Sequence, residues 1–376
     1  MPSLSPRIDL IDGTRNLWIN GALDFAQRGT AFSALNVPAA NYTAGITNNQ
    51  YIADRIKYEN SSSVVDNLGG QVLISGGPTA AQSGFNFLNT TSCIDLYPTT
   101  AVLSPGTTNY NLIRYTIEGY DYQQLHGMPF RVQFWVKSNI TGVVSVAFRN
   151  NGTTRHCIKT VTINAANTWE KKTVDVIGDT AGTWLFDSSA GCRVDIVRMV
   201  GSDFSTPNLD QWYDGNKFCA STQTNFCATV GTHFYITGFQ IIPGNFVGTS
   251  ADIPFFRAGR TIGQELAMCQ RYYEKSYDVG TAPGSVSGDT SEVYYHAGLT
   301  ASTTLPTVIM KVSKRAYTSD IVVYTPLGVA GSIRNASDST DLAASISLAA
   351  QRGFALQAST TQNKTYHYNW VYSADY

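Results

Sequence analysis

The stretch Arg131-Val132-Gln133-Phe134-Trp135-Val136-Lys137 decides the fold, because apolar and polar residues alternate along it. Successive side chains of a β-strand point to opposite faces, so Val132, Phe134 and Val136 are predicted to share the face that meets a core. Trp135 is then expected on the outward face. The same alternation recurs at 144–148, 194–196, 233–236 and 239–241. These runs predict half-buried strands.

Turns and a single helix separate the predicted strands. Asn150-Asn151-Gly152 is typical of a turn, and Gly238 lies at a change of phase where we expect a β-bulge. From Thr261 to Lys275 (TIGQELAMCQRYYEK) apolar residues fall on one helical face, which predicts a short helix at a junction. The predicted fold is therefore all-β: a jelly-roll β-sandwich domain with one short helix, followed by a smaller C-terminal β-sandwich domain.

The 376 residues divide into four segments. Residues 1–15 are predicted to form an extended N-terminal anchoring arm, and residues 16–275 the jelly-roll β-sandwich domain. The segment 276–292, rich in Gly, Ser and Pro, is predicted to be a linker or long loop. Residues 293–376 then form the C-terminal β-domain. In that domain, four aromatic residues are expected on one strand face, in the core or at a subunit interface: Tyr366, Tyr368, Trp370 and Tyr372.

Composition argues against several functions. Charged residues are only 14% of the chain and the formal net charge is -1, so the clustered basic surface of a nucleic-acid-binding protein is not expected. No apolar run approaches the ~18 residues that span a bilayer, which predicts no membrane insertion. The N-terminal sequence lacks the apolar core of a signal peptide, so we expect synthesis in a cytoplasm and a soluble product.

Cofactor chemistry is not expected either. The six cysteines are scattered without a CxxC motif, so a zinc site is not predicted and no cofactor is expected. Buried free thiols are the expected state, although a local bridge between Cys219 and Cys227 stays open. GxSxG, HExxH and phosphate-loop motifs are absent, and the acidic residues show no outstanding pair for glycoside hydrolysis. We therefore expect a non-enzymatic protein.

Several stretches resemble a family of bacteriophage tail-fibre and virion surface proteins. Residues 16–30 (NLWINGALDFAQRGT) are similar to the opening N-x-x-x-N-G-x-x-x-x-x-Q-R-G-T of that family, and Tyr51–Arg55 resembles its Y-T-A-D-R-W, with Ile56 in place of the Trp. Residues 134–138 and 167–171 are similar to paired strands of carbohydrate-binding-module jelly rolls. Residues 234–240 and 265–273 complete the series, although Gln240–Gly244 lacks the usual acid of Q-L-E-x-G.

This resemblance implies a structural protein of the virion, assembled in the host cytoplasm. A tail fibre or receptor-binding component that contacts a host-surface glycan is the first reading, and the family implies a homotrimer. Two alternatives remain open: a capsid or collar decoration protein without a receptor role, and a host polysaccharide depolymerase, whose carboxylates can lie far apart in sequence.

Two segments carry candidate contacts. The loop 203–227 contains aromatic and polar residues suited to sugar binding, although the same aromatics equally fit a loop fastened to the sandwich. The N-terminal arm is expected to bind other virion proteins, and the Arg28-Gly29 and Asp54-Arg55 pairs are candidates for a buried salt bridge. The candidate glycan or receptor contacts are Trp212, Tyr213, Asp214 and Asn216, and the candidate anchoring residues are Leu4, Ile8 and Leu10.

Overall fold

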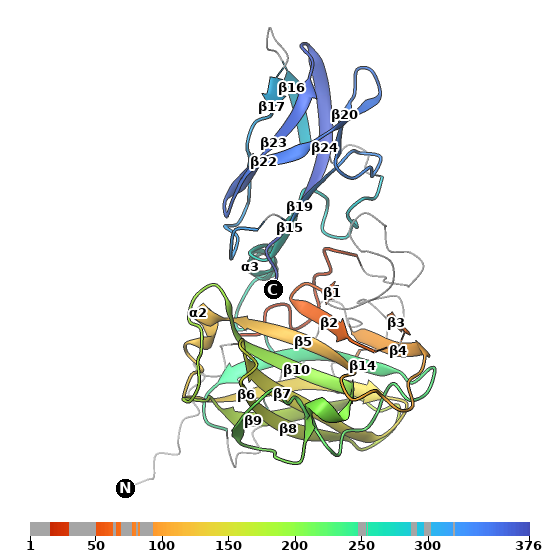
Figure 1. The fold of residues 1–376 in the computed structure, drawn as a ribbon, viewed down its shortest axis with the longest axis vertical. Helices are drawn as coiled ribbons and strands as arrows, with labels where there is room; N and C mark the ends of the chain where they lie inside the picture. Colours follow the sequence, from red (N-terminus) through yellow and green to blue (C-terminus); the bar gives the residue numbers. More distant parts are fainter. Residues whose placement is uncertain are drawn as a thin grey trace.

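The strands of the chain form two groups of sheets, one from each predicted β-domain, and Figure 1 shows the C-terminal group above the N-terminal one. The structure, a computed structural model, describes residues 16–29, 50–62, 65–68, 77–79, 82, 93–246, 253, 255–286, 292–296, 302–318 and 320–376. The arm 1–15, with Leu4, Ile8 and Leu10, lies outside the described residues. The all-β prediction is confirmed.

The N-terminal sandwich has a seven-stranded and a five-stranded antiparallel sheet. The seven-stranded sheet runs in the order β1 (Gln50–Ala53), β2 (Ile56–Asn60), β5 (Tyr110–Glu118), β10 (Ala190–Val200), β7 (Gly142–Asn150), β8 (Arg155–Ile163) and β12 (Trp212–Asp214). The five-stranded sheet runs in the order β3 (Val65–Leu68), β4 (Ile94–Thr100), β14 (Phe234–Pro243), β6 (Pro129–Ser138) and β9 (Glu170–Ile177). Short elements complete the domain: α2 (Gly119–Tyr122), η2 (Ser202–Phe204) and the parallel pair β11 (Ser205–Thr206) and β13 (Cys219–Ala220).

The main core lies between these two sheets. Val132, Phe134 and Val136 of β6 are fully buried in it, so the predicted inward face is confirmed. The bulge is confirmed as well, because the register of β14 against β6 shifts between Thr237 and Gln240, around Gly238 with its positive φ of 65°. Trp135 lies on the outward face, as predicted, but that face is covered: Trp169 and Tyr235 pack around Trp135 and leave it 8% exposed.

Residues 16–29, which carry the first resemblance, are fixed by side-chain hydrogen bonds rather than by a sheet. Asn16 Oδ1 accepts from the backbone of Trp18 (2.9 Å) and of Ile241 (3.0 Å). Asn20, at a positive φ of 61°, donates to the carbonyls of Phe25 and Asp54. A Cβ at Gly21 would lie 2.0 Å from the carbonyl oxygen of Phe239, so the close approach of these segments requires glycine.

The predicted helix at 261–275 is shorter than expected. It is α3 (Ile262–Gln270), which begins at a capping box formed by Thr261 and Gln264. The last predicted residues instead form strand β15 (Tyr273–Lys275), which pairs with β24 (Lys364–Ser373). Its partner is about 100 positions away, so the helical periodicity of this short segment could not reveal the pairing.

The C-terminal domain is built around β24. One sheet joins β24 to β15, β16 (Glu292–His296), β19 (Ile321–Tyr324) and β20 (Ser332–Asn335), with β21 (Thr340–Ala343) beyond β20. The other joins β23 (Gly353–Thr360) to β17 (Ser302–Thr304), β18 (Val308–Ile309) and β22 (Ser345–Ala350). The four-aromatic strip of β24 is buried in the core between them. Because β15 and β16 both pair with β24, the segment 276–292 connects two strands of one sheet, and the C-terminal sheet begins before it.

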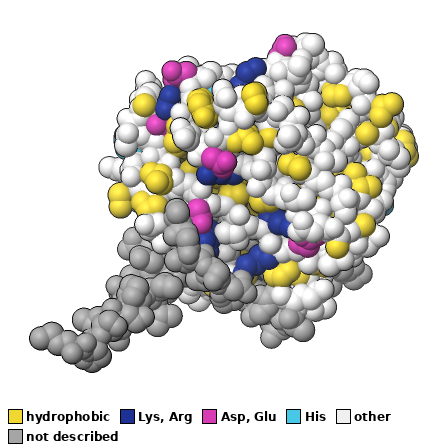
Figure 2. Space-filling view, turned by 90° about the horizontal axis from the view of Figure 1, so that it is seen from below, with side chains coloured by type: hydrophobic (Ala, Val, Ile, Leu, Met, Phe, Trp, Pro, Cys, Tyr) yellow, Lys and Arg dark blue, Asp and Glu magenta, His cyan; other side chains and the backbone are white. Residues whose placement is uncertain are grey.

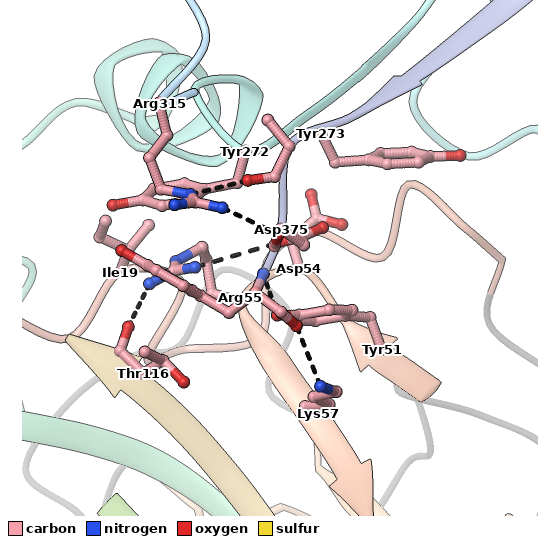
Figure 3. Close-up of polar contacts among 12 residues, drawn as sticks. Ile19, Tyr51, Asp54, Arg55, Lys57, Thr116, Tyr272, Tyr273, Arg315 and Asp375 are labelled. Atoms are coloured by element: carbon pink, nitrogen blue, oxygen red, sulfur yellow. Dashed lines mark hydrogen bonds and ion pairs between the residues drawn. The ribbon is translucent and has the colours of Figure 1, made fainter. Parts of the chain in front are cut away.

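The end of the chain returns to the junction between the two domains (Figure 3). The Asp375 carboxylate pairs with Arg28 and lies 3.8 Å from Arg55, and all three side chains are buried. The suggested salt bridge between Arg28 and Asp54 is not formed. Asp54 instead accepts hydrogen bonds from the backbone and the side chain of Gln27. The acid that bridges the arginines comes from the far end of the sequence.

Backbone contacts of residues 374–376 strengthen this junction. Arg315 donates to the carbonyls of Ala374 (2.7 Å) and Asp375 (2.9 Å). Lys57 donates to the Tyr376 carbonyl (2.9 Å), and the Tyr376 amide donates to the Tyr51 hydroxyl (3.0 Å). We call Arg28, Arg55, Arg315 and Asp375 the junction clamp. It ties the last residues of the C-terminal domain to the edge of the seven-stranded sheet.

Candidate carbohydrate-binding surface

The four candidate contacts from the sequence lie on the edge strand β12 and the turn that follows it, but they do not form one surface. Trp212 points toward the core side, packs edge-on to Trp184 with ring centroids 5.3 Å apart, and donates its indole N–H to the Ile177 carbonyl (2.7 Å). Tyr213, the next residue, points to the opposite face and lies beside His156. The strand therefore separates the two aromatic rings.

The polar members of this set have partners within the protein. The exposed Asp214 accepts a hydrogen bond from Arg155 (2.7 Å), and the Asn216 side-chain oxygen accepts one from Arg149 (2.7 Å). Phe218, farther along the loop, is buried on the outer face of the seven-stranded sheet against Leu112 and Ala147. These contacts favour the reading in which the aromatics fasten the loop to the sandwich.

A different group of aromatic residues lies on the outer face of the five-stranded sheet. His233 lies between Tyr97, whose ring is tilted by 36° (4.6 Å between centroids), and Tyr235, whose ring is stacked on it (5.4 Å). The Lys137 ammonium follows, 4.3 Å from the Tyr235 centroid and 5.1 Å from that of Trp169. We call these five residues the aromatic row. They come from β4, β6, β14 and the residues just before β14 and β9, so only the sheet brings them together.

Asp95 of β4 orients His233 within the aromatic row through a hydrogen bond. Its carboxylate is buried, and the His233 Nδ1 lies 2.9 Å from each of its oxygens. Burial raises the pKa of the Asp95 carboxyl, and the hydrogen bond and the charge of His233 oppose that shift. When Nδ1–H donates to Asp95, Nε2 is the ring nitrogen of His233 that is left to interact with a ligand. Burial also raises the pKa of Tyr235, and the negative charge of Asp95 adds to this, so its hydroxyl keeps its proton at neutral pH.

The polar tips of the row remain available to a ligand. Tyr97, Tyr235 and Lys137 are half-buried, and in the described part of the chain neither hydroxyl nor the ammonium makes a hydrogen bond. Together with His233 Nε2 they offer donors and acceptors side by side above apolar ring surface. Such a mixture matches a sugar, whose hydroxyls both donate and accept and whose C–H groups contact aromatic carbon.

Sequence reasoning missed this surface, although part of its signal was present. His233 and Tyr235 are two positions apart in an alternating stretch, which places them on one face, and Lys137 belongs to the alternating stretch 131–137. What the sequence does not contain is the pairing of β14 with β4 and β6, which sets Tyr235 beside Asp95 and Lys137.

Three acidic residues of the sandwich are engaged in ion pairs. Glu118 binds Arg271, Asp175 binds Arg131, and Asp195 binds two arginines. All six cysteines are buried free thiols, so the bridge between Cys219 and Cys227 is not formed. Within the described ranges no group of three His, Cys, Asp or Glu residues is arranged to hold a metal ion, and no helix there is long and apolar enough to cross a membrane.

Known proteins were compared by sequence and by structure. No protein family and no curated protein matches the sequence. Among solved structures, the enzymatically active domain of tailspike protein 4 of bacteriophage CBA120 aligns over 50% of this chain at 12% identity, with a TM-score of 0.28, and the chain covers 19% of that protein. The family 11 carbohydrate-binding module of a Clostridium thermocellum cellulase aligns over 53% of this chain and 97% of its own length, at 12% identity and a TM-score of 0.26.

A third solved structure, TmCBM61 in complex with β-1,4-galactotriose, aligns over 61% of this chain and 99% of its own length, at 9% identity and a TM-score of 0.28. At such identities and TM-scores the function has to be argued from the residues of this chain. The fold and the described residues define the class as an all-β sandwich protein with an aromatic, hydrogen-bonding surface on one sheet.

Proposed function

We propose that this chain is a non-enzymatic structural protein of a bacteriophage particle, a tail-fibre or receptor-binding component, whose sandwich binds a host-surface glycan through the aromatic row. The observation that carries the proposal is the set of free polar tips on Tyr97, Tyr235 and Lys137 above stacked rings. The virion role is supported by the resemblance of residues 16–275 to phage fibre proteins, and a homotrimer is part of the same proposal. Engagement of the acids in ion pairs supports a binding role over a hydrolytic one.

Glycan binding is tested with variants that remove polar atoms and keep the rings. Tyr235→Phe combined with Lys137→Met is expected to weaken binding to the preferred host glycan about tenfold or more, because each lost hydrogen bond contributes about 1 kcal/mol. Tyr317→Phe is the matched control, since Tyr317 is an exposed tyrosine of the C-terminal domain. A glycan array identifies the ligand and calorimetry measures its affinity.

Three outcomes would contradict the proposal. Equal affinities for the double variant and the control would show that the aromatic row is not the binding surface. Absence of glycan binding, with the chain still present in particles, would favour the decoration role. Release of reducing sugar from host polysaccharide by the purified chain would favour a depolymerase.

A further inference from the structure

A cluster of four cations and two carboxylates lies on the outer face of the seven-stranded sheet, all of them buried or half-buried. Two carboxylates lie there, and each is shared between two cations. Asp195 binds Arg114 and Arg149, both at 2.6 Å. Glu59 binds Arg114 and lies 3.4 Å from Lys57. Arg193, two residues from Asp195 on the same strand face, has no carboxylate partner among the described residues.

Arg193 is therefore the member of this cluster whose charge is not matched. Its guanidinium makes one hydrogen bond, to the side-chain oxygen of Asn151 (3.0 Å), although a guanidinium has five N–H donors. The side chain is half-buried, so the remaining donors are partly removed from water. Burial lowers the pKa of Arg193, the positive charges of Arg114 and Arg149 lower it further, and the charges of Asp195 and Glu59 oppose the shift. An anion bound here would make charge-assisted hydrogen bonds and favour the charged guanidinium.

The neighbours of Arg193 extend as a line across the sheet. Arg193 is paired with Arg149, Arg149 with His156, and His156 with Tyr213 on the edge strand β12. Three strand spacings separate Arg193 from Tyr213, about 14 Å. The amide of Asn216 lies along this line, bound to Arg149. An arginine at one end, an amide between and an aromatic ring at the other end fit an oligosaccharide that carries an acidic group.

Nucleic acid fits this surface less well. A phosphate backbone needs an exposed stripe of basic residues, whereas three of the four cations here are already paired with carboxylates.

We propose that Arg193 binds the carboxylate of an acidic saccharide whose chain runs past Asn216 toward Tyr213. The inference rests on the proposed role in glycan binding and adds a ligand class and a second surface to it. It assigns a saccharide contact to Tyr213 and Asn216, two of the four candidate contacts from the sequence. The two sheets then bind different groups. The aromatic row on the five-stranded sheet binds neutral hydroxyls, and Arg193 on the seven-stranded sheet binds a carboxylate.

The test uses the full chain and pairs of ligands that differ only in charge. Uronate- and sialate-containing oligosaccharides are compared with their carboxyl-reduced forms. Wild type is expected to bind the acidic form more tightly, and Arg193→Gln to lose about tenfold to a hundredfold of that affinity while binding the reduced form as before. Lys364→Gln, the same change of charge on the C-terminal domain, is expected to bind as wild type. Circular dichroism confirms that each variant is folded.

Failure of the inference is distinguishable from failure of the proposed function. The inference is overturned if Arg193→Gln binds acidic saccharides as tightly as wild type does, or if wild type binds the acidic and reduced ligands equally. Neither result affects the proposal that the aromatic row binds glycan. Lack of any saccharide binding by wild type overturns both. If light scattering shows that Arg193→Gln changes the molecular mass of the assembly, the surface is a contact between copies of the chain. That result also overturns the proposed saccharide binding.

Discussion

Removal of the Asp375 carboxylate tests whether the junction clamp holds the two domains together. The Asp375 and Arg28 side chains are 4% and 8% exposed, and Arg55 is 1% exposed, so Asp375→Asn leaves two buried guanidinium groups without their shared acid. Breaking a buried ion pair by removing one partner costs about 3–5 kcal/mol. We expect the lower end of that range, because Arg55 and Arg28 keep the faces of Tyr272 (3.5 Å) and Tyr273 (3.6 Å) as partners.

Differential scanning calorimetry measures the effect. A loss of about 3 kcal/mol corresponds to a fall in melting temperature of about 6 °C or more for a domain of this size. Because the clamp joins the domains, we also expect the variant to unfold in two resolved transitions. Asp341→Asn is the control, since the Asp341–Arg334 pair is exposed and such pairs contribute about 0–1 kcal/mol. Equal melting temperatures for the two variants would refute the reasoning.

Two further predictions concern the sandwich itself. Phe134→Ala and Trp135→Ala should both lower the free energy of unfolding by about 3–5 kcal/mol, measured by urea denaturation, because the strand is buried on both faces. Ile309→Ala, at an exposed site, should change it little. A small loss of stability in Trp135→Ala would contradict this prediction. Burial alone would raise the pKa of Asp195, but the charges of Arg114 and Arg149 lower it from 3.8 to about 2. The ionised Asp195 therefore contributes about 2 kcal/mol to the free energy of unfolding above pH 4, and this contribution is lost as the pH falls toward 2. Asp195→Asn should therefore show a flatter decline of melting temperature between pH 4 and 2, and parallel curves for variant and wild type would argue against the linkage.

Local alternation predicted the inner face of the sandwich because each strand carries that information in its own sequence. Val132, Phe134 and Val136 need only to be apolar at every second position. The cover over the outer faces cannot be predicted in this way. Trp135 is buried by Trp169, which arrives from a separate turn, and the loop carrying Phe218 covers the seven-stranded sheet from about 70 positions beyond β7.

The candidate sites show the same limit more sharply. Trp212 and Tyr213 are adjacent in sequence, yet the strand sends them to opposite faces, so composition alone overstated their joint role. Arg28 and Arg55 were correctly suspected of a buried ion pair, but their acid is Asp375, more than 300 positions away. A sequence shows which side chains are charged. Which residue pairs with each of them depends on the order of strands in the sheets and on how the domains pack together.

Lys57 connects the junction with the charged face of the seven-stranded sheet. Its ammonium donates to the Tyr376 carbonyl at the clamp and lies 3.4 Å from Glu59, which in turn binds Arg114. Burial lowers the pKa of Lys57, the charge of Glu59 opposes this shift, and the charge of Arg114 adds to it. One lysine therefore contacts both the last residue of the C-terminal domain and the ion-pair cluster of the seven-stranded sheet. The contact with Tyr376 cannot be predicted from local sequence, because it depends on how distant segments pack.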